Sequence, residues 1–403
     1  VSAGSLVNSG ALESETALAV TAAGVTNGSG ATMLSSTRAA EIASSGSIDN
    51  QGTLQGATGL AVRAGANLSS SGKITGSGGT TTLSVGGTFT NTGETKTAGD
   101  LVLTAGGLDN RNILLSVGNM DLLGLGGLSN SDLILAGGTL TAQVSGAVSN
   151  NQGAIISGGD MAITGLGGGR AGSITNSLGV IQSDGGDVLL RAGSVHNQGD
   201  SDFEVKENVL IYEGTFGETP GVPARNSVPG AVITPEGYAY MKDGSTVVID
   251  HPYPGLDWTV YYDTGNVTVK LYGTVATATG ASTGKGEIVA GRNLTIDAGG
   301  AVLNDFSTLA AGGDLAISAN SLVNKGIENV ATLWFEWATN GQFNRCFGGP
   351  CVWFRNEGGT AYAGEIIGPG VGSIIQAGGG VNINVGTFDN TSEDPRDHDS
   401  WDM

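Results

Sequence analysis

The residues best suited to acid–base chemistry lie close together in the middle of the chain. Asp250, His251, Asp257 and Asp263 fall within a short stretch that also holds Trp258. Paired carboxylates act as acid and base in sugar hydrolysis, and a sugar would stack on an aromatic ring. These carboxylates sit at or near expected turns, however, where solvated Asp is the usual state. We therefore expect no catalytic residue here, and a polysaccharide-degrading enzyme is the less favoured alternative.

Aromatic side chains are the stronger candidates for binding. Apart from Phe89, the 5 Trp, 8 Tyr and 9 Phe residues all follow residue 199. Tyr and Trp are favoured at binding hot spots, and large rings also form the cores of small modules, so we expect both roles among them. The candidate recognition residues are Tyr238, Tyr240, Tyr253, Trp258, Tyr261, Tyr262, Trp334, Trp337, Phe343, Phe347 and Trp353.

Two cysteines, Cys346 and Cys351, flank a Gly-Gly-Pro turn. Such a turn can bring the two sulfur atoms together, which favours a disulfide and an oxidising compartment. Two thiols without nearby histidines make a poor zinc site, and the three histidines of the chain are scattered. We expect no metal site and no cofactor.

The rest of the chain consists of a repeat of about 20 residues. One unit runs from Leu101 and Leu103 through the turn Gly106–Gly107 to Leu108 and Asn110, and the pattern then recurs. Apolar residues that alternate with Ser, Thr and Asp have period two, which indicates short β-strands. Strands in a fixed repeat with glycine turns are typical of a parallel β-solenoid, so the expected fold class is all-β.

An Asn recurs at the end of each repeat unit. Stacked Asn side chains can form hydrogen bonds along a ladder and fix its register, so we interpret this column as structural rather than as a ligand site. Ser70 replaces the Asn once. The best-defined members are Asn91, Asn110, Asn130, Asn150, Asn176, Asn197, Asn304 and Asn324.

Two aromatic segments interrupt the repeat. The first also contains most of the prolines, and two hairpins are expected in it: residues 238–242 with 246–250, and 258–262 with 267–271 through a turn at Thr264–Gly265. The expected domains are a β-helix at 1–199, an antiparallel β insertion at 200–284, β-helix coils at 285–327, a disulfide-stapled insertion at 328–372, a last coil at 373–390 and an acidic linker at 391–403.

Charge and composition narrow the possible partners. The net charge of −20 repels nucleic acid and anionic lipid, so no nucleic-acid partner is expected. No apolar run is long enough to span a bilayer. The start of the chain already lies within a repeat and shows no basic segment followed by an apolar core, so we expect no signal peptide and a piece cut from a longer protein. Regular Leu, Ile and Val pairs argue against disorder despite the 71 glycines.

The repeat unit itself resembles a known family. The pattern Gly-Gly-Asp-Leu-x-Ile-x-Ala-x-x-Leu-x-Asn at 312–324 is similar to the repeats of filamentous haemagglutinin and of the CdiA toxins of contact-dependent growth inhibition. The resemblance covers about two thirds of the chain, and it does not extend to either insertion. It implies a right-handed parallel β-helix in a secreted exoprotein on the bacterial cell surface, exported by an outer-membrane two-partner-secretion transporter.

The same resemblance implies a role in cell contact. In the CdiA branch, the segment after the first repeat block would bind an outer-membrane protein or glycan receptor on a neighbouring cell, ahead of toxin delivery. We expect the two aromatic insertions to form the binding surface. The alternatives are a host-cell or biofilm adhesin of the filamentous haemagglutinin type and a passive spacer.

Overall fold

The computed structural model describes residues 1–200, 203–216, 239–242, 246–249, 258–278, 285–345, 352–355 and 358–393. For part of the residues in 203–216, 239–278 and 327–371, it describes the strand without the side chain. The chain divides into two compact units. Unit 1 comprises Val1–Ser201, Gly280–Gly326 and Gly372–Ser392, and unit 2 comprises Asp202–Thr279, Ile327–Val371 and Glu393–Met403.

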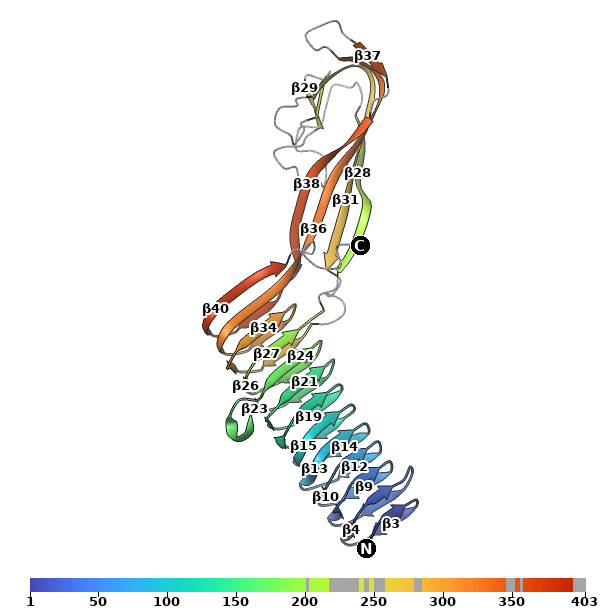
Figure 1. Ribbon diagram of the computed structural model, residues 1–403, viewed down its shortest axis with the longest axis vertical. Coiled ribbons are helices and arrows are strands. Elements are labelled where there is room, and N and C mark those ends of the chain that lie inside the picture. Colours follow the sequence, from blue (N-terminus) through green and yellow to red (C-terminus); the bar gives the residue numbers. More distant parts are fainter. Residues whose placement is uncertain are drawn as a thin grey trace. The chain divides into compact units, whose positions relative to one another are not determined.

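Unit 1 is the predicted parallel β-solenoid, with about 12 turns spaced ~21 residues apart (Figure 1). Each turn places one strand in each of three rows. The first row contains β1 (Ser2–Ala3), β4 (Leu18–Ala22), β7 (Ala40–Ser44), β10 (Leu60–Ala64), β17 (Met120–Leu125), β20 (Leu140–Val144), β23 (Met161–Thr164), β26 (Val188–Ala192) and β33 (Leu294–Ala298). The second row contains β2 (Leu6–Asn8), β5 (Val25–Asn27), β8 (Ile48–Asn50), β11 (Leu68–Ser70), β18 (Leu128–Asn130), β21 (Ala147–Asn151), β24 (Ser173–Ser177), β27 (Val195–Gln198) and β34 (Ala301–Asp305).

Four long strands run through both of these rows: β13 (Thr81–Asn91), β15 (Leu101–Asn110), β36 (Leu315–Arg345) and β40 (Val381–Glu393). The third row is a separate 12-stranded sheet. Its strands are β3 (Ala11–Ser14), β6 (Thr32–Ser35), β9 (Thr53–Gly56), β12 (Lys73–Gly76), β14 (Glu94–Thr97), β16 (Leu114–Ser116), β19 (Leu133–Ala136), β22 (Ala154–Ser157), β25 (Val180–Ser183), β32 (Glu287–Ala290), β35 (Thr308–Ala311) and β39 (Ile374–Ala377). A short 3₁₀ turn, η1 (Leu166–Gly168), lies between β23 and β24.

Like residues stack on like in unit 1, because every strand pairs in parallel with its equivalent in the next turn. Val62 in β10, for example, is opposite Ile42 in one neighbour and Leu83 in the other. All three side chains are fully buried. Alternate residues of each strand therefore point into one continuous apolar core, which no single turn could enclose by itself.

The Asn column forms a second, polar stack inside the same core. Its Asn members from Asn27 to Asn304 are completely buried, and, except at the turn that carries Ser70, side-chain hydrogen bonds of 2.7–3.0 Å join each Asn to its equivalent in the next turn. In each bond Nδ2 of one Asn donates to Oδ1 of the next. Because a buried amide without partners is strongly unfavourable, the ladder fixes the register of the turns.

The turn that carries Ser70 instead of Asn shows how the ladder tolerates a gap. The Oδ1 of Asn91, in the following turn, accepts a hydrogen bond from Oγ1 of Thr95 at 3.1 Å. Thr95 is buried at a position where the adjacent turns carry Ile74 and Leu114. The hydroxyl group of Thr95, at a position that is apolar in the adjacent turns, thus supplies the donor that the missing Asn would have provided.

Unit 2 is an antiparallel sheet. Its strands are β28 (Phe203–Phe216), β29 (Ala239–Lys242), β30 (Thr246–Ile249), β31 (Trp258–Ala278), the later part of β36, β37 (Val352–Arg355) and β38 (Gly358–Val371). The hairpin expected near 238–250 is present as the antiparallel pair β29–β30. The hairpin expected at Thr264–Gly265 is wrong. These residues lie inside β31, which continues because its partner β36 runs alongside it, with only a register shift at this point.

The coupling between Ser70 and Thr95 gives a stability prediction. Thr95→Val should lower the free energy of unfolding by about 1–3 kcal/mol, because the buried Oδ1 of Asn91 loses its donor. Adding Ser70→Asn should restore a donor and recover most of that loss, as measured by urea unfolding.

Thr90→Val is the matched control, because Thr90 lies on the outward side of β13 and is only partly buried. It should change the urea midpoint little. If Ser70→Asn has the same effect with Thr95 and with Val at position 95, the two positions are not coupled.

Candidate functional site

Both aromatic insertions leave unit 1 at the same corner of the solenoid turn, directly after a ladder Asn. The first insertion follows Asn197, at the end of β27, and the third-row strand β32 begins after it at Glu287. The second follows Asn324 in β36, and β39 begins after it at Ile374. One complete turn, which carries Asn304 and has no insertion, separates them. The corner after the ladder Asn is therefore the place where this solenoid accepts extra chain.

The ladder Asn closes this corner with the same hydrogen bond whether or not an insertion is present. In the turns of Asn150, Asn176 and Asn304, which carry no insertion, Nδ2 donates to the carbonyl oxygen three residues further on, at 2.9–3.1 Å. Nδ2 of Asn197 makes this bond to Gly286 at 3.2 Å, across 89 residues of sequence. Nδ2 of Asn324 makes it to Ser373 at 3.2 Å, across 49 residues. The geometry of the corner is thus independent of the length of the inserted chain.

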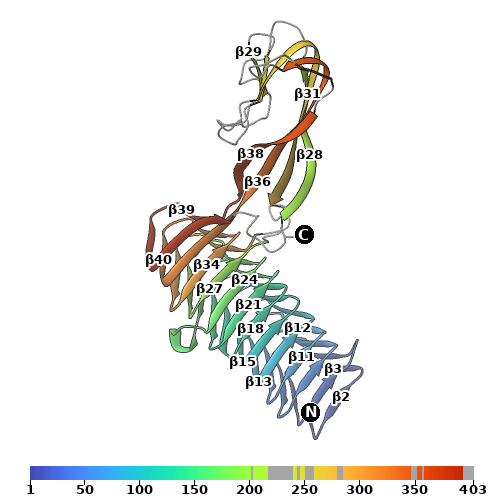
Figure 2. The same cartoon turned by 45° about the horizontal axis from the view of Figure 1, so that its top comes forward.

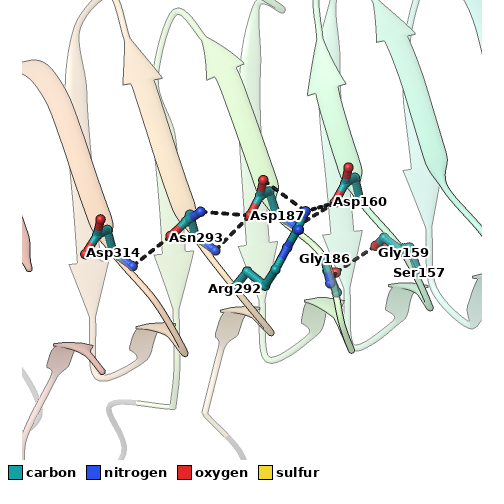
Figure 3. A network of polar contacts seen from close by, with 9 residues as sticks. Ser157, Gly159, Asp160, Gly186, Asp187, Arg292, Asn293 and Asp314 are labelled. Carbon is teal, nitrogen blue, oxygen red and sulfur yellow. Dashed lines mark hydrogen bonds and ion pairs between the residues drawn. The ribbon is translucent and has the colours of Figure 1, made fainter. Parts of the chain in front are cut away.

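A network of charged side chains ties the turn after the first insertion to the turns before it (Figure 3). Nη2 of Arg292 lies 2.8 Å from Oδ1 of Asp160 and 3.2 Å from Oδ2 of Asp187. The backbone N–H of Asp187 donates to Oδ1 of Asp160 at 2.9 Å, and that of Asn293 donates to Oδ1 of Asp187 at 3.0 Å. The hydrogen bond from the Asp187 backbone, with a further contribution from Arg292, holds the pKa of Asp160 below its usual value.

A second network supports the same turn. Asp297 in β33 accepts Nη2 of Arg170 at 2.6 Å through Oδ1 and Nε of Arg191 at 2.9 Å through Oδ2. Arg191 also donates to the carbonyl oxygen of Gly168 in η1 at 2.8 Å. The hydrogen bond from Arg170 is the main cause that lowers the pKa of Asp297. The two networks hold the turns on either side of the first insertion together.

The sheet of unit 2 combines strands from both insertions. β31, from the first insertion, pairs antiparallel with β28 on one side and with β36 on the other, and β36 pairs with β38 (Figure 2). In the order β28–β31–β36–β38, the first two strands come from the first insertion and the last two from the second, and the pair β31–β36 joins them. Neither insertion could build this sheet by itself.

One row of apolar and aromatic residues crosses all four strands. Leu210 in β28 is opposite Tyr272 in β31, Tyr272 is opposite Trp334 in β36, and Trp334 is opposite Tyr362 in β38. Residues directly opposite each other point to the same face of a sheet, so these four share one face. The rings of Tyr272 and Trp334 are stacked, with centroids 6.3 Å apart and an interplanar angle of 20°. We call these four residues the cross-strand row.

The cross-strand row is on the accessible face of the sheet. Leu210 and Tyr362 are 48% and 49% exposed, and Tyr272 and Trp334 are half-buried. The next residues along the strands, Leu271 and Leu333, point to the opposite face and are only 0% and 1% exposed. The core of unit 2 at this level is thus formed by the leucines, and the row is left at the surface.

Polar side chains flank the cross-strand row on both sides. Lys270 lies two residues before Tyr272 in β31. Its Nζ is 3.5 Å from Oε1 of Glu213 in β28, and Lys270 is opposite Glu336 in β36. On the other side of the row, Thr274 is opposite Thr332. An apolar centre with donors and acceptors on both sides is the usual composition of a ligand-binding surface.

The structure places the predicted recognition residues unevenly. Trp334 is the one whose side chain is described, and it lies in the cross-strand row. Tyr240, Trp258, Tyr261, Tyr262, Trp337, Phe343 and Trp353 lie on strands whose backbone is described, but their side chains are outside the described residues. Tyr238, Tyr253, Phe347 and both cysteines of the predicted disulfide, Cys346 and Cys351, are outside the described residues altogether, as are Asp250, His251 and Asp257.

Sequence reasoning missed three members of the cross-strand row. Tyr272, Leu210 and Tyr362 are not among the candidate recognition residues that the sequence indicates. The only local signal was the alternation Lys270-Leu271-Tyr272, which assigns two faces to the strand but does not show which face is buried. The row exists only because β31 pairs with β36, and that pairing is not visible in either segment alone.

Among the residues that the structure describes, no group of three or more His, Cys, Asp or Glu side chains could hold a metal ion. In the same residues, no helix is long and apolar enough to cross a membrane.

The network at Asp297 gives a pH prediction. The folded-state pKa of Asp297 is lower than the ordinary value of about 3.9, so its ion pairs stabilise the fold fully above that pH and less as the pH falls through the folded-state pKa. Asp297→Asn should lower the free energy of unfolding by about 1 kcal/mol at pH 7. The two proteins should converge in acid, as measured by urea unfolding at a series of pH values.

Asp121→Asn is the matched control, because Asp121 lies on the outward side of β17 and has no ion pair among the described residues. A difference between Asp297→Asn and the parent chain that persists unchanged at low pH would contradict this account.

The two faces of the unit 2 sheet give a second stability prediction. Leu333→Ala should lower the free energy of unfolding by about 2–5 kcal/mol, because it opens a cavity among fully buried groups. Trp334→Thr, one residue further on, should lower it less, by about 1–2 kcal/mol, because the ring is only partly buried and Thr suits a strand. Urea unfolding compares the two variants, and equal losses would place Trp334 in the core.

Comparison with known proteins identifies the repeat. The haemagglutinin repeat matches residues 1–52, 34–141, 115–200, 264–334 and 369–394. The chain is 34% identical over 132 residues to the deoxyribonuclease CdiA of Dickeya dadantii (strain 3937), which covers 32% of this chain and 3% of the relative. It is 27% identical over 256 residues to the tRNA nuclease CdiA of Escherichia coli (strain STEC_O31), which covers 62% of this chain and 7% of the relative.

The chain thus corresponds to only a small part of each of these long relatives. No solved structure gives a significant match. The matched repeats span well over half of the chain, and most of them are turns of the solenoid described above. The match at 264–334 also extends into both insertions, so the expectation that the resemblance covers neither of them is wrong. The chain therefore belongs to the haemagglutinin-repeat family, and unit 1 is its β-solenoid.

Proposed function

We propose that this chain is the stalk and receptor-recognition segment of a large bacterial cell-surface exoprotein. In this proposal, the full-length protein leaves the cell through an outer-membrane two-partner-secretion transporter. Unit 2 then binds a receptor on a neighbouring cell, ahead of delivery of a toxin carried elsewhere in the protein. The similarity to two CdiA proteins, both named as nucleases, supports the toxin-delivery setting.

The observation that carries the proposal is the partly exposed cross-strand row. The lateral surface of unit 1 in residues 1–199 presents small polar side chains, which offer few anchors to a partner. Leu210, Tyr272, Trp334 and Tyr362, in contrast, lie together on an accessible face of unit 2. A passive spacer would need neither these residues nor a sheet that requires two separate insertions.

The corner geometry allows a clean test by deletion. Joining Gly199 to Gly286 gives Asn197-Gln198-Gly199-Gly286, with the spacing of the natural corner Asn176-Ser177-Leu178-Gly179. Joining Gly326 to Ser373 reproduces the corner Asn304-Asp305-Phe306-Ser307 in the same way. The third position has positive φ in both natural corners, 53° at Leu178 and 49° at Phe306, and glycine adopts that conformation readily.

The chain lacking residues 200–285 and 327–372 should still fold as a solenoid but should no longer bind target cells. Binding of the fluorescently labelled 403-residue chain to a panel of Gram-negative cells, measured by flow cytometry, is compared with that of the deletion variant. Far-UV circular dichroism and thermal unfolding check that the variant folds.

Each single deletion should also abolish binding, because the sheet needs strands from both insertions. Binding that survives the double deletion would contradict the proposal, because the recognition surface would then lie on unit 1. Binding of the parent chain to host cells but to no bacterium would favour an adhesin over growth inhibition.

A further inference from the structure

We propose that the cross-strand row is a binding platform for a neutral oligosaccharide. This inference rests on the proposed recognition function and specifies the chemistry of the ligand. Its elements are the stacked rings of Tyr272 and Trp334, the exposed ring of Tyr362 at one end of the row, and polar side chains on both sides.

The shape of the row suits a chain of sugar rings. Adjacent strands in a sheet lie about 4.8 Å apart, so the row across four strands extends roughly 14 Å. A pyranose has an apolar face of C–H groups and a rim of hydroxyl groups. Its face would lie on the aromatic rings, where apolar area is available without a deep pocket. Successive sugar units would follow the row from strand to strand.

The flanking residues suit the rim of hydroxyl groups. Lys270 and Glu336, on neighbouring strands, offer donors and acceptors on one side of the row, and the hydroxyls of Thr274 and Thr332 offer both on the other. A protein partner would be expected to exclude water from the centre of a larger contact area. Here polar groups lie directly beside the rings, which favours a narrow, polar ligand.

Charge determines the class of oligosaccharide. Lys270 is already paired with Glu213, and Glu336 adds a further negative charge beside the row. The chain as a whole carries a net charge of −20. A phosphorylated, sulfated or carboxylated sugar would therefore be repelled, so the ligand is neutral.

The test uses the complete 403-residue chain on an array of neutral oligosaccharides built from glucose, galactose, mannose and N-acetylhexosamines, with sulfated and phosphorylated counterparts. The parent chain should bind at least one neutral oligosaccharide and bind its charged counterparts more weakly. Trp334→Thr and Tyr272→Thr should each weaken that binding at least tenfold. Phe388→Thr is the matched control, because Phe388 is an exposed aromatic residue of β40 in unit 1, and it should have no effect.

Three results would overturn the proposal: no neutral oligosaccharide is bound, an anionic one is preferred, or Trp334→Thr binds as tightly as the parent chain. Thermal unfolding shows whether each variant is folded. Cell binding separates this inference from the function that it rests on. If both Thr variants still bind target cells, the receptor contacts another surface and only the oligosaccharide site fails. If the parent chain binds the oligosaccharide but no cell, the recognition function fails instead.

Discussion

The structure depends on one buried hydrogen-bonded group, the side-chain amide of the ladder Asn. The amide of Asn150, for example, bonds to its equivalent in the next turn and also to the carbonyl oxygen that closes its own corner. A buried amide loses its bonds to water, so it is favourable only where every partner is in place. Apolar side chains alone would tolerate a shift of one turn against the next, because they pack without direction. The Asn ladder does not tolerate such a shift, and the apolar columns stay aligned as a result.

The same amide explains how a regular solenoid can carry large insertions. At Asn197 and Asn324 the closing bond is made to a residue that is close in space but far along the chain. The turn is completed by this bond and by strand pairing, so the chain between the two ends is free to form another structure. The arginines at 170, 191 and 292 then link the turns on either side of the first insertion. A second unit can in this way be added to the solenoid without disturbing its stacking.

The fold of unit 1 could be predicted from sequence because its determinants are local and repeated. Leu101, Leu103 and Asn110 have equivalents every twenty residues or so, and each occurrence strengthens the same interpretation. Unit 2 could be predicted only in part, because its pairing is not local. Thr264–Gly265 has the sequence of a hairpin turn but lies within a continuous strand, since β36 provides a partner over most of the length of β31. Trp334 was selected for its residue type, whereas Tyr272 and Tyr362 acquire their significance only from the register that places them beside it.

Exchange of the Asn side-chain amides tests the central claim most directly. In the 403-residue chain labelled with ¹⁵N at asparagine, hydrogen exchange of each Nδ2 group can be followed by NMR spectroscopy. Asn197 and Asn324 should exchange as slowly as Asn130 and Asn150 in turns without insertions, and far more slowly than the exposed Asn67 and Asn119. Rapid exchange at Asn197 and Asn324, with protection kept elsewhere in the ladder, would show that the insertions open the corners, and would contradict this account.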